Sequence, residues 1–178
     1  MAAFPRASAM DLVSKPALFE QTFMPHLNAA YNLARWLTRN DHDAEDLAQE
    51  SYLRAFRAFE TFQGQDARAW LLAIVRNTCF TWLKKKGAQP FVEFDEQMHT
   101  VDSPNAESLV LNQAALDSLQ DCLEALPLEF REAIVLRELE ELSYKEISGI
   151  AGVPVGTVMS RLARARKRLS ECLAGALK

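Results

Sequence analysis

The sequence has little glycine or proline and no long apolar run, and these shortages narrow the class of protein. Six Gly and seven Pro among 178 residues, with 49% hydrophobic residues, leave little loop-forming material and predict a compact, mostly helical chain. The strongest apolar run, residues 69–75, is too short to span a bilayer, and the N-terminus shows no secretory signal. We therefore expect a cytoplasmic protein with no direct membrane insertion.

Cysteine is also scarce. The three cysteines, Cys79, Cys122 and Cys172, are far apart in the sequence and form no C-x-x-C pair. Their odd number and wide spacing are typical of a reducing compartment, where thiols stay free and pack as small apolar groups. We therefore expect free thiols, and a redox-sensing cysteine stays open as the alternative.

Charge is not spread evenly along the chain, whose formal net charge is −4. Two acidic blocks, 41–60 and 117–146, alternate with two basic segments, 67–86 and 153–169, and residues 91–107 hold five acidic residues and no basic one. Because opposite charges lie on separate segments, we expect separate binding partners rather than one uniform surface. In residues 91–107 the apolar residues show only a weak regular spacing, which indicates a linker.

Apolar residues recur at helical spacing through most of the chain, and no alternating strand pattern of useful length is present. These periods predict helices over residues 27–37, 47–59, 70–83, 116–125 and 129–139. The second of these carries a broad apolar stripe that includes Leu53, and its acidic start suits a helix N-terminus. We therefore expect an all-α protein.

A further short helix is marked by the sequence LSYKEI, in which Ser143 and Glu146 form a capping box. This helix should end near Gly152, and Pro154 and Gly156 should separate it from the next helix. Two helices joined by so short a turn form a helix-turn-helix, whose second helix enters a DNA major groove.

The expected second helix, within residues 153–169, carries five basic side chains and no acidic one. On a helical wheel its apolar residues fall within one narrow arc, which should face the core: Val158, Leu162, Ala165 and Leu169. The far side carries short polar and basic residues, which can contact base edges and phosphates. These candidates for DNA contact are Thr157, Ser160, Arg161, Arg164, Lys167 and Arg168.

Two blocks of the chain resemble one family. The C-terminal block contains LSYKEISGIAGVPVGTVMSRLARARKRL and resembles region 4 of the extracytoplasmic-function (ECF, group IV) sigma factors of the sigma-70 family. The N-terminal block contains DAEDLAQESYLRAFRAFETFQG and AWLLAIVRNTCFTWLKKK and resembles region 2 of the same family. The resemblance implies two small helical domains joined by a flexible acidic linker, the second domain containing the helix-turn-helix. The implied divisions are an N-terminal extension (1–17), region 2 (18–87), the linker (88–109) and region 4 (110–178).

This resemblance implies a sigma factor, which binds bacterial RNA polymerase core enzyme and directs it to particular promoters. In the family, the acidic segment of region 2 docks on the clamp helices of the polymerase β′ subunit, and the β subunit is a further contact. The matching residues here are Asp43, Glu45, Asp46, Gln49 and Glu50. No metal, cofactor or catalytic residue is implied, so we do not expect an enzyme.

The resemblance also implies two promoter-binding surfaces. Region 2 of the family melts the −10 element and captures an unstacked base, because stacking and hydrogen bonds recover the cost of unpairing. The matching residues are Phe62 and Asn77 at the captured base, with Arg54, Arg76, Lys84 and Lys85 as basic contacts. In region 4, the candidates on the helix-turn-helix should bind the −35 element. Some members have Arg in place of Met159 and an aromatic residue in place of Ala163, so the promoter sequence is not implied.

Family members are commonly restrained by an anti-sigma factor, often membrane-bound, and we expect such a partner besides polymerase and promoter DNA. In the family, the linker threads the polymerase near its active-site and RNA-exit channels.

Two other functions account for parts of the sequence. A helix-turn-helix regulator that binds DNA without joining polymerase would account for the C-terminal half of the chain. This interpretation assigns no role to residues 41–86. A metal-dependent phosphohydrolase would take its ligands from residues 41–46. Of the three histidines, however, only His42 lies among acidic residues at ligand spacing. The sigma factor is therefore the favoured interpretation.

Overall fold

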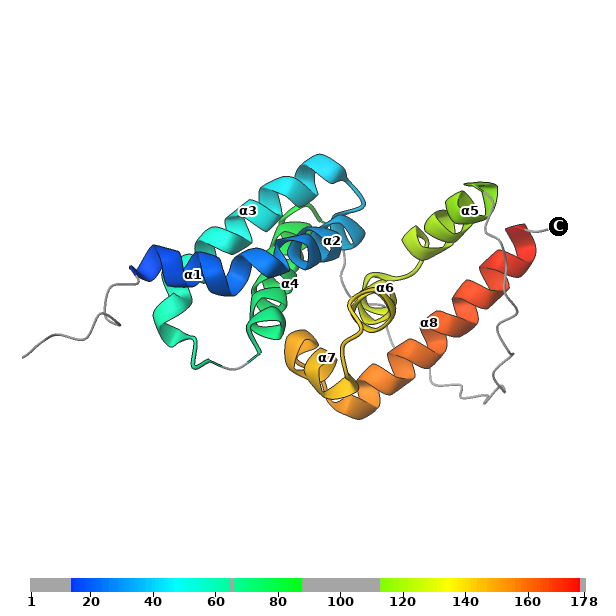
Figure 1. The fold of residues 1–178 in the computed structure, drawn as a ribbon. Coiled ribbons are helices and arrows are strands. Elements are labelled where there is room, and N and C mark those ends of the chain that lie inside the picture. The colour runs from blue at the N-terminus through cyan, green and yellow to red at the C-terminus, as the bar shows by residue number, and fades with distance from the viewer. Residues whose placement is uncertain (1–13, 65, 88–112, 177–178) are drawn as a thin grey trace, which may run out of the picture.

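The structure is a computed structural model, and it describes residues 14–64, 66–87 and 113–176. Its elements are α1 (Lys15–Phe23), η1 (Met24–His26), α2 (Leu27–Thr38), α3 (Asp41–Ala58), η2 (Phe59–Thr61), α4 (Ala67–Lys85), α5 (Gln113–Glu124), α6 (Leu128–Ile134), η3 (Val135–Leu139), α7 (Tyr144–Ala151) and α8 (Val155–Ala176). Every regular element in these ranges is a helix, which confirms the predicted all-α fold. The helices form two groups, α1 to α4 and α5 to α8 (Figure 1). No helix of the described part is long and apolar enough to cross a membrane.

The first group is built on α2, α3 and α4, which pack against one another through aliphatic side chains. Leu33 of α2 and Leu72 and Val75 of α4 are completely buried, and each such side chain stabilises the fold by about 1.5–3 kcal/mol. Helix α3 begins after Asn40, whose side-chain oxygen accepts a hydrogen bond from the backbone N–H of Asp43 at 3.0 Å.

Helix α1 begins at Lys15, before the expected domain boundary at residue 18. Its Phe19 and Phe23 are buried, and the Phe19 ring centroid lies 4.8 Å from that of Tyr52 on α3. Leu53, in contrast, is 57% exposed, so its expected place in the buried stripe is wrong. The apolar stripe of α3 is wider than the surface that α1, α2 and α4 cover.

Helices α7 and α8 form the predicted helix-turn-helix. The capping box is present: Ser143 Oγ accepts from the Glu146 backbone N–H at 3.3 Å, and the Ser143 backbone N–H donates to the Glu146 carboxylate at 2.7 Å. Helix α7 ends at Gly152, whose φ of 67° is a left-handed conformation that glycine adopts without strain. Helix α8 begins at Val155, so Gly156 lies in its first turn and not in the connection as expected.

The predicted helix over residues 129–139 is α-helical only as far as Ile134, and η3 continues it with a wider turn. In that turn the backbone N–H of Glu140 donates to the carbonyl oxygen of Val135, five residues earlier, at 3.0 Å. This π-helical turn rotates the end of the helix relative to a regular α-helix.

The two helix groups pack directly on each other, with α4 beside α7 and α2 beside α6 (Figure 1). Their buried side chains form one continuous apolar cluster, which includes Leu72 of α4 and Ile147 and Ile150 of α7. The two groups therefore share a core. The acidic linker expected over residues 88–109 lies outside the described residues.

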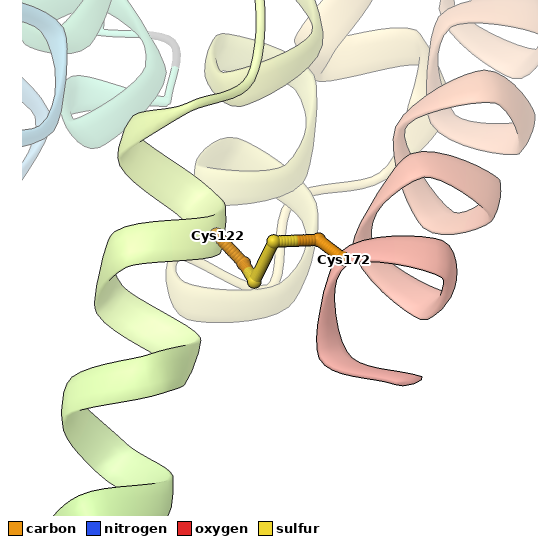
Figure 2. Close-up of a disulfide and its surroundings, with 2 residues drawn as sticks. All are labelled: Cys122 and Cys172. Carbon is orange, nitrogen blue, oxygen red and sulfur yellow. A yellow bond between two sulfur atoms is a disulfide. The ribbon is translucent and has the colours of Figure 1, made fainter. Parts of the chain in front are cut away.

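The cysteines depart from the expectation of free thiols. Cys122 of α5 and Cys172 of α8 form a disulfide, with their Cα atoms 5.8 Å apart (Figure 2). The fold brings together two residues that are 50 positions apart, and neither their spacing nor the odd number of cysteines indicates such a pair. Cys79 is a free thiol as predicted, and burial raises its pKa to about 12.

Candidate polymerase and promoter surfaces

The five residues expected to bind polymerase all lie on α3. Four of them are exposed: Glu45, Asp46, Gln49 and Glu50. Asp43 is partly buried in the first turn, and its carboxylate lies 3.4 Å from Nζ of Lys86. Glu50 accepts a hydrogen bond from Arg54 Nε, one turn later, at 3.0 Å. Arg54, which was assigned to the −10 surface, therefore lies beside the acidic residues in this structure.

An apolar groove of about 590 Å³ adjoins this acidic side of α3. Its walls include Met24 and Leu53, which are 54% and 57% exposed, and Glu45 and Gln49 lie along it. An exposed apolar patch with a polar rim is typical of a protein-binding surface. Helical periodicity did not reveal the groove, because it counts Leu53 as a core residue.

Phe62, the residue expected at the captured base, follows η2 within a cluster of aromatic rings. Its centroid lies 5.3 Å from that of Phe23 and 5.3 Å from that of Trp70, at the start of α4. The ring is only partly buried. Neighbouring side chains thus fix its orientation while part of it stays open to solvent.

Arg76 and Asn77 are neighbours on α4, about two turns after Trp70. Asn77 is exposed, and its side-chain oxygen accepts a hydrogen bond from Arg76 Nη1 at 3.4 Å. Arg76 also donates through Nε to Glu132 of the second helix group at 2.7 Å. Lys84 and Lys85 are exposed in the last turn of the helix.

The predicted apolar arc of α8 is confirmed, because Val158, Leu162 and Ala165 are buried and Leu169 is half-buried. The six candidates for −35 contact differ in exposure: Lys167 and Arg168 are exposed, Thr157, Ser160 and Arg164 are partly buried, and only 11% of the Arg161 side chain is exposed. Arg161 is therefore held largely inside the molecule.

Comparison with known proteins matches both helix groups to one family. Residues 22–89 match sigma-70 region 2, and residues 116–169 match sigma-70 region 4. The chain is 37% identical over 147 residues to the ECF RNA polymerase sigma-E factor of Haemophilus influenzae, and the alignment covers 77% of each protein. The chain belongs to the ECF RNA polymerase sigma factors. Members of this family are transcription initiation factors and not enzymes.

Two further comparisons place this ECF sigma factor among its relatives. The ECF RNA polymerase sigma factor SigE of Mycolicibacterium smegmatis is 36% identical over 166 residues, which are 92% of this chain but only 64% of that protein. The chain thus spans less than two thirds of that relative. The sigma factor RpoE of Bartonella quintana, solved in complex with the anti-sigma factor NepR, has a TM-score of 0.69 and 30% identity. That alignment covers 88% of this chain and 96% of RpoE.

The metal site considered in the sequence analysis would lie in the acidic first turns of α3, residues 41–46. His42 Nε2 lies 3.8 Å from Asp46 Oδ2, and both side chains are exposed. Among the residues that the structure describes, no group of three or more His, Cys, Asp and Glu side chains is placed to hold a metal.

Sequence reasoning did not identify Glu132, which connects the two regions. It is 1% exposed; its Oε1 accepts from Arg76 Nε at 2.7 Å, and its Oε2 lies 3.8 Å from Arg161 Nη1. Burial raises the pKa of Glu132, and the two arginines oppose that shift. The sequence did contain a signal for Glu132. It lies one helical turn before Leu136, on the apolar side of the helix, and an acidic residue buried on that side needs a charged or hydrogen-bonding partner.

Proposed function

We propose that this protein is a group IV sigma factor that binds RNA polymerase core enzyme in the cytoplasm and directs initiation at particular promoters. One observation carries the proposal: a single chain holds, in the family's order, a region 2 with an acidic α3 and a region 4 with a helix-turn-helix. A protein that only bound DNA would need the second region alone.

The proposed polymerase-binding surface consists of the acidic side of α3 and the adjoining groove. Asp43, Glu45, Asp46, Gln49 and Glu50 would dock on the β′ clamp helices, and region 4 would contact the β subunit. In such a surface the apolar groove supplies most of the affinity, while the exposed charges orient the partner and speed association.

The proposed promoter surfaces lie on α4 and α8. Phe62 would stack on an unpaired −10 base, and Asn77 offers both a donor and an acceptor to its edge. The proposed backbone contacts at −10 are Arg54, Arg76, Lys84 and Lys85, and the proposed −35 contacts are Thr157, Ser160, Arg161, Arg164, Lys167 and Arg168. In this proposal region 2 comprises residues 18–87, the linker 88–109 and region 4 110–178.

An anti-sigma factor is the third proposed partner, besides polymerase and promoter DNA, and it would be membrane-bound as such factors often are in this family. Support comes from the likeness to RpoE of Bartonella quintana, whose structure contains the anti-sigma factor NepR. The partner would compete with polymerase by covering α3 and the groove.

Transcription in vitro tests the proposed function. Purified protein and bacterial core polymerase would be added to fragmented genomic DNA of the source organism, and the 5′ ends of the transcripts sequenced. We expect discrete start sites that share two upstream elements and are absent with core polymerase alone. If the folded protein binds DNA but does not stimulate transcription, the proposal is overturned in favour of a regulator that acts without joining polymerase.

A further inference from the structure

The first turns of α8 carry almost no charge, although the helix as a whole is basic. Arg161 is the only charged residue among residues 155–163, and the other basic residues of the helix all lie within residues 164–168. In a helix-turn-helix, the N-terminal part of the second helix contacts the base edges. The part of α8 that is expected to read bases is therefore the part with the least charge.

Two polar side chains of this part are engaged within the protein. Arg161 Nη1 lies 3.8 Å from Oε2 of Glu132 on α6, and only 11% of the Arg161 side chain is exposed. The Ser160 hydroxyl donates to the carbonyl oxygen of Thr157 at 2.9 Å. Bases are usually read by hydrogen bonds from side chains such as arginine, and these internal contacts limit that means of recognition at this end of α8.

The exposed side chains of the same part are apolar or small. Met159 is 54% exposed, and Val155, one turn earlier, is 40% exposed. Gly156 and Ala163 are also exposed, and they lie on the same side of the helix as Met159, three residues before it and four residues after it. A long apolar side chain thus stands between two small residues, which allow the helix to approach another surface closely.

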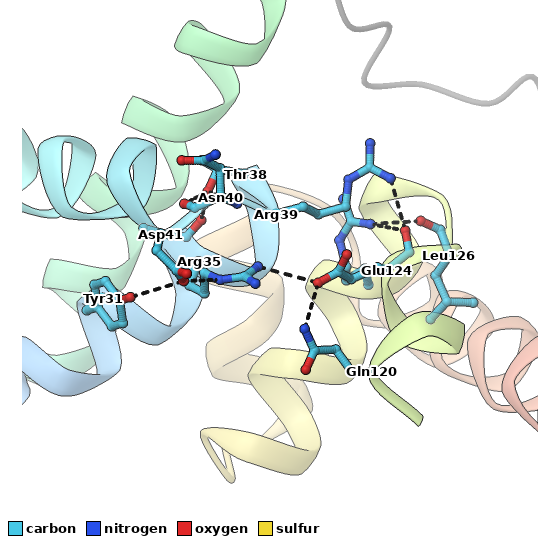
Figure 3. Close-up of polar contacts among 11 residues, drawn as sticks. Tyr31, Arg35, Thr38, Arg39, Asn40, Asp41, Gln120, Glu124 and Leu126 are labelled. Carbon is cyan, nitrogen blue, oxygen red and sulfur yellow. Dashed lines mark hydrogen bonds and ion pairs between the residues drawn. The ribbon is translucent and has the colours of Figure 1, made fainter. Parts of the chain in front are cut away.

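The contact with region 2 does not cover this face of α8. Region 2 meets region 4 mainly through α6 and α7. It also meets the end of α5, where Arg35 Nη1 lies 3.5 Å from Glu124 Oε1 and Arg39 Nη1 donates to the Glu124 carbonyl oxygen at 3.2 Å (Figure 3). The exposure of Met159 is that in the whole chain, so this face is open while the two regions are in contact.

The neighbouring charges favour duplex DNA as the surface that covers this face. The basic residues 164–168 continue the same helix and can neutralise phosphates beside the groove that the first turns enter. Among the bases, thymine presents a methyl group in the major groove. Contact between this group and an apolar side chain removes both from water, so an exposed apolar side chain in the groove favours thymine.

We infer that Met159 is a specificity-determining residue of the proposed −35 surface, and that it selects a thymine through apolar contact with the 5-methyl group. Gly156 and Ala163 provide the space in which the helix comes close enough for this contact. The assignment to the −35 element rests on the proposed function. Contact with a thymine methyl group in duplex DNA does not depend on polymerase and can be measured separately.

Replacement of thymine by uracil is the most direct probe, because it removes only the methyl group. The full chain, alone and with core polymerase, would first select its preferred duplex from a random library, with core polymerase alone as the reference. Each thymine of the selected site would then be replaced singly by uracil, and the affinity measured by fluorescence anisotropy. We expect one replacement in the −35 element to weaken binding about fourfold, which corresponds to about 0.8 kcal/mol for one buried methyl group.

Met159→Ala is the test variant, and Leu116→Ala is its matched control. Leu116 is an exposed apolar residue of the same region, on α5 and outside the proposed promoter surfaces. We expect Met159→Ala to bind the thymine duplex about fourfold more weakly than the native chain does, and to bind the thymine and uracil duplexes equally. Leu116→Ala should keep the fourfold difference between the two duplexes.

Met159→Arg is a second variant, whose readout is base preference and not affinity. Arginine donates two hydrogen bonds to the major-groove edge of guanine. We therefore expect this variant to prefer guanine at the position where the native chain prefers thymine. Because Met159 is exposed, both substitutions should leave the fold intact, and circular dichroism checks this.

The inference is overturned if the native chain selects no sequence, if it tolerates every uracil replacement, or if Met159→Ala is as sensitive to uracil as the native chain. The second of these results would indicate that the apolar face binds a protein and not DNA. If transcription in vitro succeeds but uracil sensitivity does not depend on Met159, only this inference is removed. If the native chain does not stimulate transcription but the sensitivity depends on Met159, the proposed function is removed and the base contact stands.

Discussion

At the scale of single residues, Asn77 is the exposed neighbour of the largely buried Arg76. We predict that Asn77→Ala reduces promoter melting but not binding to core polymerase, because a lost pair of base-edge hydrogen bonds costs about 1–3 kcal/mol. Permanganate reactivity of thymines in the −10 region measures the melting. Asn32→Ala, an exposed change on α2, is the control. Reactivity equal to that of the native protein would show that Asn77 does not hold the base.

Cys79 is a completely buried free thiol, so it should not react with an alkylating reagent in the folded chain. At about pH 8.5 an ordinary thiol is half ionised, whereas burial holds the pKa of Cys79 at about 12, so its thiol stays protonated and unreactive. We predict that the native, unreduced chain takes up no iodoacetamide, that the denatured chain takes up one, and that the reduced and denatured chain takes up three. Mass spectrometry counts the labels. Rapid labelling of the native chain would contradict the burial of Cys79.

At the scale of elements, the disulfide ties α5 to the end of α8. It closes a loop of 50 residues, and the loop-closure entropy predicts that reduction lowers the free energy of unfolding by about 4 kcal/mol. Cys172 is exposed, so a reductant can reach the bond. Urea unfolding followed by circular dichroism, with and without reductant, measures the difference. The double variant Cys122→Ser, Cys172→Ser should not respond to reductant, and a native chain that is equally unresponsive would contradict the prediction.

Local features of the elements were predictable, and features that depend on packing between elements were not. The cap formed by Ser143 and Glu146 and the buried arc around Leu162 follow from spacing within a single helix. Leu53 has the same apolar character as Leu162, but more than half of it is exposed in the structure. The Cys122 disulfide likewise depends on how α5 meets α8, which no periodicity within either helix specifies.

At the scale of the whole molecule, resemblance to the family could assign residues to surfaces but could not show which of them the chain itself covers. Arg76 and Arg161 were assigned to two different promoter elements from two different segments. In the structure they meet at Glu132, because α4 packs beside α7 and places the two regions face to face. The burial of Arg76 therefore depends on the arrangement of the two regions, whereas Arg161 meets Glu132 within region 4.

The proposed polymerase-binding surface on α3 lies outside the contact between the two regions, so its exposure does not depend on how the regions are arranged. We predict that Asp46→Arg weakens binding to core polymerase by about tenfold, or 1.4 kcal/mol, since it places repulsion where the proposed surface offers an attractive charge. Competition with a labelled sigma factor for core polymerase measures the affinity. Asp121→Arg, the same change at an exposed position on α5, is the control. Asp46→Arg should leave the radius of gyration of the free chain unchanged, because Asp46 is exposed on α3 and the two regions meet through α4 with α7 and α2 with α6. Equal affinity of Asp46→Arg and Asp121→Arg for core polymerase would show that Asp46 is not part of the docking surface.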